Sequence, residues 1–119
     1  MEMLFVMDPL ARIQIKKDTT FAFMLEAQRR GWTVAWCTAG ELGADAGGGV
    51  AMASRVRVAP VAGAHYEEEA RQRRRLSEFR VIWMRTDPPV TMDYFYATLL
   101  LDMVDPANTL VINRPAGVR

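Results

Sequence analysis

The stretch "MLFVMDPLARIQIKKDTTFAFMLEAQRRGWTVAWCT", residues 3–38, decides the fold of this chain. It opens with the apolar run 3–7, which stops at Asp8 and is typical of a strand covered on both faces. A helical pattern over 18–30 follows, and then a β-branched and aromatic run over 32–38. Strand, helix and strand within this length predict a right-handed crossover between two parallel strands.

The helix predicted over residues 18–30 carries signals at both ends. Asp18 or Thr19 can cap its N-terminus, and Gly31 supplies the stop. Three apolar residues share one face at helical spacing: Phe21, Met24 and Leu25.

Beyond residue 38 the pattern changes and then returns. Residues 41–61 contain three consecutive glycines and an alternating run, which predict a hairpin-like excursion with one face in solvent. Residues 65–79 are strongly charged and predict a solvated helix or a mobile loop. The apolar run 81–84, the helical pattern 91–104 and the apolar run 109–113 predict strand, helix and strand again.

Periodicity also predicts which side chains share a face. In the excursion, alternation groups together the apolar residues Val50, Met52, Val56 and Val58. In the second helix, which Thr91 can cap, helical spacing groups together Phe95, Thr98, Leu99 and Met103.

This element order predicts an α/β fold, namely a Rossmann-like open, mainly parallel sheet with helices on both faces and a β-hairpin excursion. With 119 residues the chain has the length of one domain, so we expect a single core over 1–119. In such folds a central strand usually feeds another helix. Because the chain stops soon after its last strand, we expect it to be part of something longer.

Composition excludes several classes of function. The 15 Lys and Arg nearly balance the 14 Asp and Glu, so no strong field favours nucleic acid or an anionic membrane as partner. One cysteine and one histidine exclude an internal disulfide and a metal site built on a histidine pair. No apolar run suits a signal peptide or a membrane span, and we expect a cytoplasmic protein.

Polar residues follow three of the predicted strands. Asp8 follows the first strand, Arg85 and Asp87 follow the strand over 81–84, and Asn113 ends the last strand. In open α/β sheets the ligand crevice lies beyond the carboxyl ends of the parallel strands. If the strands are parallel neighbours, these residues meet at one edge of the sheet.

Two features near this edge suit an anionic ligand. Lys16 and Lys17 precede the first helix and add charge to its N-terminal N–H groups, although such lysines are also often simply solvated. Arg85 leaves a buried strand before two prolines that stiffen the exit, and it can bind a carboxylate bidentately. The alternative for Arg85 is a structural ion pair with Asp8 or Asp87.

The remaining features favour structural roles. The basic run 71–75 follows three glutamates that neutralise it locally, which indicates a charged surface rather than a nucleic-acid site. Cys37 is typical of a small core residue and His65 of an exposed loop residue. The chain has no dinucleotide-binding glycine pattern, no Walker loop and no nucleophile elbow, so no complete catalytic set is predicted.

Three stretches taken together resemble the N-terminal, pre-ATP-grasp domain of prokaryotic glutathione synthetase. They are "VMDPLARIQIKKDTTFAFMLEAQRRG" (6–31), "VIWMRTDPPVTMDYFYATLLLD" (81–102) and "TLVINRPAGVR" (109–119). The resemblance covers nearly the whole chain and is weakest over residues 40–76.

The resemblance implies that the complete enzyme is a ligase that joins γ-glutamylcysteine to glycine through an acyl phosphate, using ATP and Mg²⁺. It also implies that ATP-grasp domains absent from this chain bind the nucleotide and metal, so no cofactor is expected for these residues alone. The 119 residues should not catalyse the ligation by themselves, and the full protein is expected to be a homo-oligomer.

Thirteen residues of this chain stand at positions that match the family pattern. They are Asp8, Pro9, Lys16, Lys17, Asp18, Thr19, Thr20, Arg85, Asp87, Pro88, Pro89, Asn113 and Pro115. The substrate-binding residues expected from this match are Arg85, Lys17, Asp18, Asp87, Asp8 and Asn113. Arg85 and the region of Lys17 are expected to face the dipeptide carboxylates, and no catalytic residue or metal ligand is expected. The family pattern has a lysine at the position of Arg114, which is a mild change.

Two alternatives remain open at this point. One is the N-terminal domain of another ATP-grasp peptide ligase. The other is a non-catalytic Rossmann-like binding module, such as a receiver-like domain. A receiver would need an acidic pair after the first strand and a lysine after the last, whereas this chain has Asp8-Pro9 and Asn113-Arg114 there.

Overall fold

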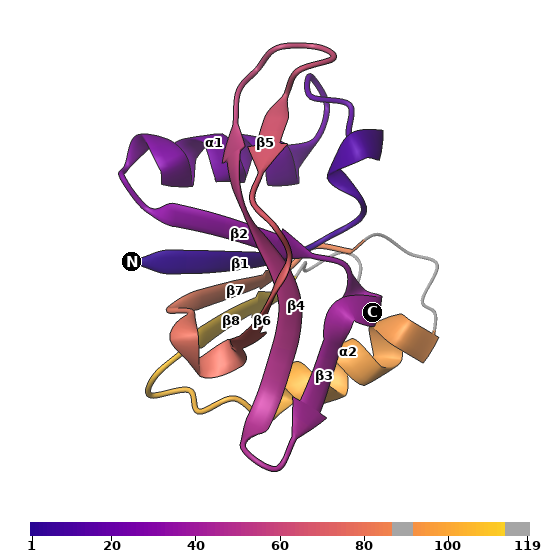
Figure 1. Cartoon of the computed structure of the whole chain (residues 1–119), viewed down its shortest axis with the longest axis vertical. Coiled ribbons are helices and arrows are strands. Elements are labelled where there is room, and N and C mark those ends of the chain that lie inside the picture. The colour runs from indigo at the N-terminus through magenta and orange to yellow at the C-terminus, as the bar shows by residue number, and fades with distance from the viewer. Residues whose placement is uncertain (87–91, 114–119) are drawn as a thin grey trace.

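The computed structural model describes residues 1–86 and 92–113, with the backbone alone for 92–95 and 113. Within this part an eight-stranded sheet has the order β3-β4-β2-β1-β7-β8, and β5 and β6 pair with β4 (Figure 1). The strands are β1 (Glu2–Val6), β2 (Thr33–Cys37), β3 (Leu42–Asp45), β4 (Gly48–Val58), β5 (Tyr66–Glu68), β6 (Gln72–Arg75), β7 (Val81–Met84) and β8 (Leu110–Asn113). The helices are α1 (Thr19–Arg29), α2 (Met92–Asp102) and the short 3₁₀ segments η1 (Leu10–Arg12), η2 (Ala39–Glu41) and η3 (Leu76–Glu78).

The four strands β2, β1, β7 and β8 form a parallel half, as the sequence predicts. In register, Val6 lies beside Cys37 on one side and Met84 on the other, and Met84 lies beside Asn113. The carboxyl ends of these strands therefore meet at one edge. Continuous apolar runs suit these strands because both faces of the sheet are covered.

The first helix begins and ends where its signals predict. The Asp18 side chain caps it by accepting a hydrogen bond from the Phe21 amide at 2.9 Å. At the other end Gly31 has a φ of 82°, which lies in the left-handed region that glycine adopts without strain. Phe21 and Met24 are fully buried, and Leu25 is half-buried.

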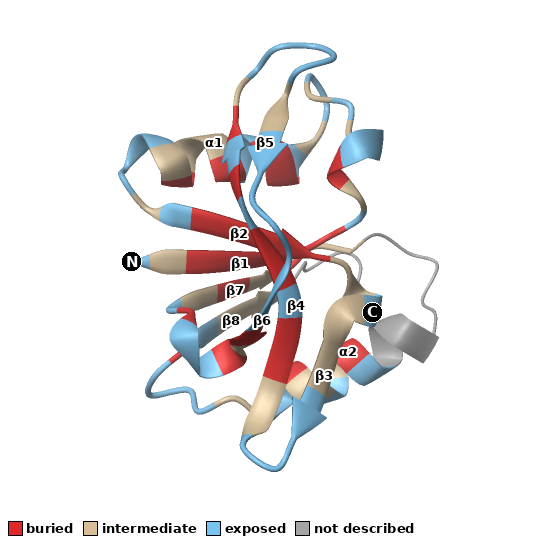
Figure 2. Cartoon of the chain, in the orientation of Figure 1, coloured by how far each residue is buried: buried red, intermediate tan, exposed pale blue. Residues whose placement is uncertain are grey.

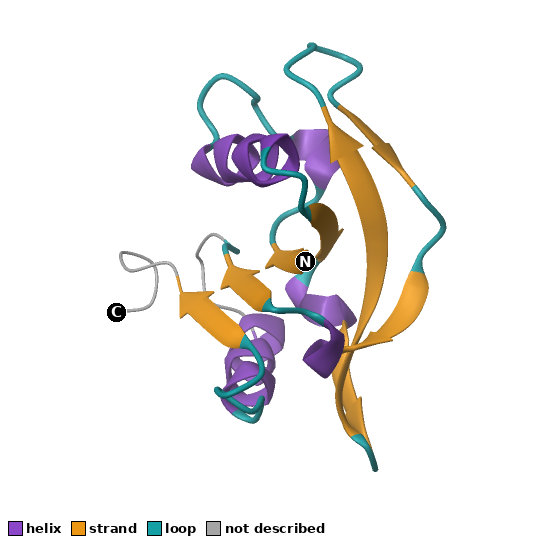
Figure 3. Ribbon diagram, turned by 90° about the vertical axis from the view of Figure 1, so that its left-hand side faces the viewer, coloured by secondary structure: helices purple, strands orange, loops and turns teal. Residues whose placement is uncertain are grey.

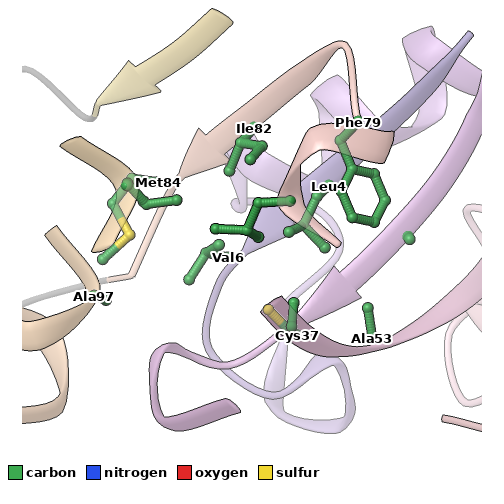
Figure 4. Close-up of a cluster of buried hydrophobic side chains, with 12 residues drawn as sticks. Leu4, Val6, Cys37, Ala53, Phe79, Ile82, Met84 and Ala97 are labelled. Atoms are coloured by element: carbon green, nitrogen blue, oxygen red, sulfur yellow. The ribbon is translucent and has the colours of Figure 1, made fainter. Parts of the chain in front are cut away.

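The two faces of the sheet carry two apolar clusters. Figure 2 shows in red where the buried residues lie. Side chains alternate between faces along a strand, so Leu4 and Val6 join the cluster that α2 covers, whereas Phe5 joins the cluster that α1 covers. Figure 4 shows the α2-side cluster, in which Phe79 and Ile82 lie near Leu4 and Val6. The prediction of helices on both faces is confirmed.

The predicted inner face of the second helix is wrong. Leu99 is 47% exposed and Met103, just past the helix, is 74% exposed. Ala97 and Leu101, four residues apart, are buried against the sheet instead. The helix is apolar nearly all round, so its own pattern does not distinguish the inner from the outer face. Thr91 lies outside the described residues.

Strand β4 confirms the predicted excursion but corrects its buried set. It is 11 residues long and contributes side chains to both clusters, and its path is curved (Figure 3). Ala51 and Ala53 point into the α2-side cluster, whereas Val56 and Val58 point into the α1-side cluster. Met52 is therefore 40% exposed, because a strand that serves two cores changes its buried face along its length.

The charged segment 65–79 is neither a helix nor a mobile loop. It forms β5, β6 and η3, and both strands pair antiparallel with β4. Ion pairs across strands join the segment to the rest of the sheet: Arg73 and Arg75 both bind Asp45 of β3. The segment forms strands because its backbone hydrogen-bonds to the backbone N–H and C=O groups of β4. The charge pattern of the segment does not predict this pairing.

The sheet is therefore mixed, and the prediction of a mainly parallel sheet is wrong. Three strand pairs are parallel (β1 with β2 and β7, and β7 with β8), and the four pairs that involve β4 are antiparallel. What the structure establishes is a mixed α/β fold whose sheet curls strongly at β4 (Figure 3). The Rossmann-like designation stays a prediction.

One partly buried ion pair fastens the excursion, which in the structure comprises β3 to β6, to the parallel half. Arg74 of β6 is 8% exposed and donates two hydrogen bonds to the Glu2 carboxylate of β1, at 2.6 and 3.0 Å. Arg55 adds a third at 3.1 Å. Partial burial alone would raise the pKa of Glu2, but the hydrogen bonds from the two arginines outweigh it and hold this pKa below its ordinary value of 4.5.

Candidate functional site

The carboxyl edge of the parallel half brings together chain segments that lie far apart in the sequence. Asp8 follows the end of β1, Arg85 follows β7, and Asn113 ends β8. The Arg85 amide donates to the Val6 carbonyl at 2.7 Å, which continues the β1–β7 pairing past the end of the strand. Of Asn113 only the backbone position in β8 is described.

A groove of about 390 Å³ lies at this edge, between the end of β1 and the start of α1. Its lining residues are Asp8, Pro9, Arg12, Ile13, Gln14, Lys17 and Asp18. Three predicted site residues, Asp8, Lys17 and Asp18, thus share one concave surface. Two cationic and two carboxylate side chains line it, so the groove suits a ligand that carries both charges.

The turn before α1 fixes how Lys17 and Asp18 are presented. The Lys17 and Asp18 amides both donate to the Gln14 carbonyl, at 3.0 and 3.1 Å. The Asp18 carboxylate is engaged as the cap of the helix, so its contribution to the groove is partly structural. Lys17 is exposed beside it, whereas Lys16 is exposed but does not line the groove.

Arg85 is half-buried and oriented from two sides. Its Nε donates to the hydroxyl of Thr20 in the first turn of α1, at 3.1 Å. Its guanidinium carbon lies 5.2 Å from the centre of the Phe23 ring, a cation–π arrangement. Arg85 does not line the groove, but its bond to Thr20 fastens it to the same helix start that Asp18 caps.

Three aromatic rings in contact form a row that begins at Phe23, beside the Arg85 guanidinium. Phe23 is tilted against Trp83 with ring centres 5.0 Å apart, and Trp83 is stacked on Phe5 at 5.7 Å. These rings tie the first turns of α1 to β7 and β1. The Arg85 guanidinium is therefore held in position by packed aromatic rings.

Two residues at this site were not predicted from the sequence, and some residues that were predicted lie outside the described part of the chain. Arg12 lines the groove and Phe23 lies under Arg85, yet neither follows a strand, and only their distance from the helix start could have indicated them. Asp87, with the prolines after it, lies outside the described residues, as do Arg114 and Pro115.

Features elsewhere in the described residues offer no second chemical centre. Burial raises the pKa of the Cys37 thiol far above its ordinary value, and Cys37 is fully buried, so it packs as a small core residue. Over residues 1–86 and 92–113 no group of three or more His, Cys, Asp or Glu residues could hold a metal ion. None of the helices in this part is long and apolar enough to cross a bilayer.

Comparison with known proteins gives matches over nearly the whole chain. The family model described as "Prokaryotic glutathione synthetase, N-terminal domain" matches residues 1–119. The chain is 40% identical over 114 residues to the glutathione synthetase of Vibrio vulnificus strain YJ016 and 41% identical over 114 residues to that of Yersinia pestis. These matches cover 96% of the chain and 36% of each relative. The chain thus spans about a third of the length of the curated relatives it matches.

Proposed function

The chain belongs to the family of prokaryotic glutathione synthetase N-terminal domains, and we propose that it forms one wall of the substrate cleft of a ligase joining γ-glutamylcysteine to glycine. The observation that carries this proposal is the groove of mixed charge at the carboxyl edge of the parallel strands. This is the edge at which open α/β sheets bind their ligands.

The proposed ligand and the groove have matching chemistry. γ-Glutamylcysteine carries carboxylates and an ammonium group at neutral pH. Lys17 and Arg85 would bind the carboxylates, the arginine with its bidentate geometry, and Asp8 would accept from the ammonium group. Arg12 of the groove adds a second cation. Asp18 would position this wall by capping α1 rather than by binding directly.

The support for Arg85 is its preorganisation. Thr20 and the Phe23 ring orient the guanidinium before any ligand arrives, so little side-chain freedom remains to be lost on binding. Asp87 and Asn113 stay in the proposal as further contacts on the strength of the family resemblance alone.

ATP and Mg²⁺ belong to the proposed reaction of the complete enzyme, where they activate the dipeptide carboxylate as an acyl phosphate. The described residues contain no acidic cluster suited to Mg²⁺, so we assign nucleotide and metal to the length of the relatives that this chain does not span. The residues of this chain would bind and orient the dipeptide. A Rossmann-like core and a homo-oligomeric complete enzyme are part of the same proposal.

The test is kinetic and uses the complete product of the gene that encodes this chain. Arg85→Ala should raise the KM for γ-glutamylcysteine by about 10- to 100-fold, the usual effect of losing a charged hydrogen bond. The KM for glycine should stay within about twofold, because the arginine is assigned to the dipeptide alone.

Arg80→Ala is the matched control. Arg80 is an exposed arginine just before the amino end of the same strand, so its loss should leave both KM values unchanged. An unchanged dipeptide KM in Arg85→Ala would overturn the assignment of Arg85. Failure of the unmodified protein to use glycine, with turnover of another acceptor, would instead favour a different peptide ligase of the ATP-grasp type.

A further inference from the structure

The segment η1 forms a wall of the groove but is too short to hold itself in place. Pro9, Arg12 and Ile13 line the groove, and the buried Leu10 lies between them. Its internal hydrogen bonds are those of a single 3₁₀ turn, from Arg12 to Pro9 and from Ile13 to Leu10. An isolated turn of this length is not stable in water, so other parts of the molecule must fix its position.

His65 supplies such a contact from the far end of the excursion. Its Nε2 lies 2.7 Å from the Leu10 carbonyl, which joins residues 55 apart in the sequence. A carbonyl can only accept, so Nε2 carries the proton and donates. The imidazole ring also packs edge-on against Phe21 of α1, at 5.9 Å, and against Tyr66, at 4.9 Å. One side chain thereby links η1, α1 and β5.

The loop that carries His65 is itself well ordered by local hydrogen bonds. The Ala59 amide donates to the His65 carbonyl at 2.9 Å, and the Ala64 amide donates to the Val61 carbonyl at 3.1 Å. Gly63 has a φ of 79°, a conformation that favours glycine. In Figure 1 this loop extends beyond α1 at the tip of the β4–β5 ribbon. The loop therefore presents His65 to η1 in a defined geometry.

We propose that His65 is a positioning residue for the substrate groove, through which the tip of the β4–β5 hairpin holds η1 and with it Arg12 and the Pro9 wall. This inference rests on the proposed function of the groove. It assigns a role to the sole histidine and to a part of the chain outside the parallel half. His65 acts through the Leu10 carbonyl and touches no substrate.

Two variants separate the hydrogen bond from the bulk of the ring. His65→Ala removes the donor. His65→Gln keeps an N–H donor at a comparable reach from the backbone and is the conservative rescue. Both are made in the complete gene product, alongside the unmodified protein.

The first measurement is amide hydrogen exchange and needs no ligand. In His65→Ala the amides of Arg12 and Ile13, which close η1, should exchange about tenfold faster, the change expected for the loss of one hydrogen bond. In His65→Gln the change should be about threefold or less. The Arg85 amide, bonded to Val6 in the parallel half, should not change and reports that the fold is intact.

The second measurement is kinetic. His65→Ala should raise the KM for γ-glutamylcysteine about three- to tenfold with kcat nearly constant, and His65→Gln should restore most of the affinity. Unchanged exchange at Arg12 and Ile13 overturns the proposal. Faster exchange with an unchanged dipeptide KM, in an enzyme whose KM still responds to Arg85→Ala, also overturns it, because His65 would then be merely structural. A dipeptide KM that responds to neither Arg85→Ala nor His65→Ala means that the proposed function of the groove has failed.

Discussion

The parallel half and the antiparallel excursion of this molecule differ in the balance of interactions that stabilises them. In the parallel half, β1 is buried on both faces, and its apolar side chains join both apolar clusters. The excursion buries side chains of β4 in both clusters, and it also forms ion pairs at the surface, where Asp45 binds Arg73 and Arg75, and Arg71 binds Glu41. Apolar burial, which is large per residue, stabilises the parallel half, whereas the excursion combines apolar burial along β4 with backbone pairing and exposed ion pairs that add little.

The difference has a functional side. The proposed substrate residues lie at the edge of the parallel half, where Arg85 packs on Phe23, which in turn packs on Trp83. The excursion reaches this edge at its tip through His65.

The largest expected loss of stability comes from a cavity in the core of the parallel half. Phe5→Ala removes a fully buried ring stacked on Trp83 and should lower the free energy of unfolding by about 4 kcal/mol. Because small domains have only about 5–15 kcal/mol in total, much of the stability is lost. Urea unfolding followed by tryptophan fluorescence measures it.

Met52→Ala is the corresponding change in the excursion. Met52 is 40% exposed on β4, so truncation should cost no more than about 1 kcal/mol. Equal losses for Phe5→Ala and Met52→Ala would contradict the contrast between the two halves.

The exception within the excursion is the ion pair that joins the halves. Arg74→Ala leaves the partly buried Glu2 carboxylate without its main partner and should lower the free energy of unfolding by about 3 kcal/mol. Arg73→Ala, one residue away on the solvent face, should give no resolvable change because its pair with Asp45 is exposed. Similar unfolding midpoints for the two variants would show that burial does not distinguish these arginines.

Low pH should also weaken the ion pair of Glu2, and this is the smallest of the expected effects on stability. The pKa of Glu2 is lower in the folded chain than the ordinary value of 4.5, so the folded state binds this proton less readily than the unfolded state. The stabilisation is therefore complete above about pH 4.5 and is lost as the pH falls through the folded pKa. Urea midpoints between pH 6 and pH 3 should fall more steeply in the unmodified chain than in Glu2→Gln. Parallel curves would exclude this linkage.

Local patterns predicted the parallel half well, for a physical reason. A continuous apolar run such as residues 3–7, or a cap such as Asp18 followed by a helical stripe, needs only its near neighbours to specify strand or helix. The meeting of Asp8 and Arg85 at one edge then follows from parallel pairing. The candidate substrate came from the family resemblance, because hydrophobic periodicity carries no information about a ligand.

What the sequence by itself determined was the order of elements in the parallel half, the ends of α1 and the edge where its polar residues gather. Tertiary structure alone decided that residues 72–75 form a strand and that Leu101 rather than Leu99 faces the core. It also decided that Arg12 lines the groove and that His65 contacts η1. Those outcomes depend on partners distant in the chain: open backbone groups along β4, the sheet beneath α2, and the carbonyl of Leu10. Such partners leave no periodic trace in the sequence, because the free energy that selects them arises only when the remote segments meet.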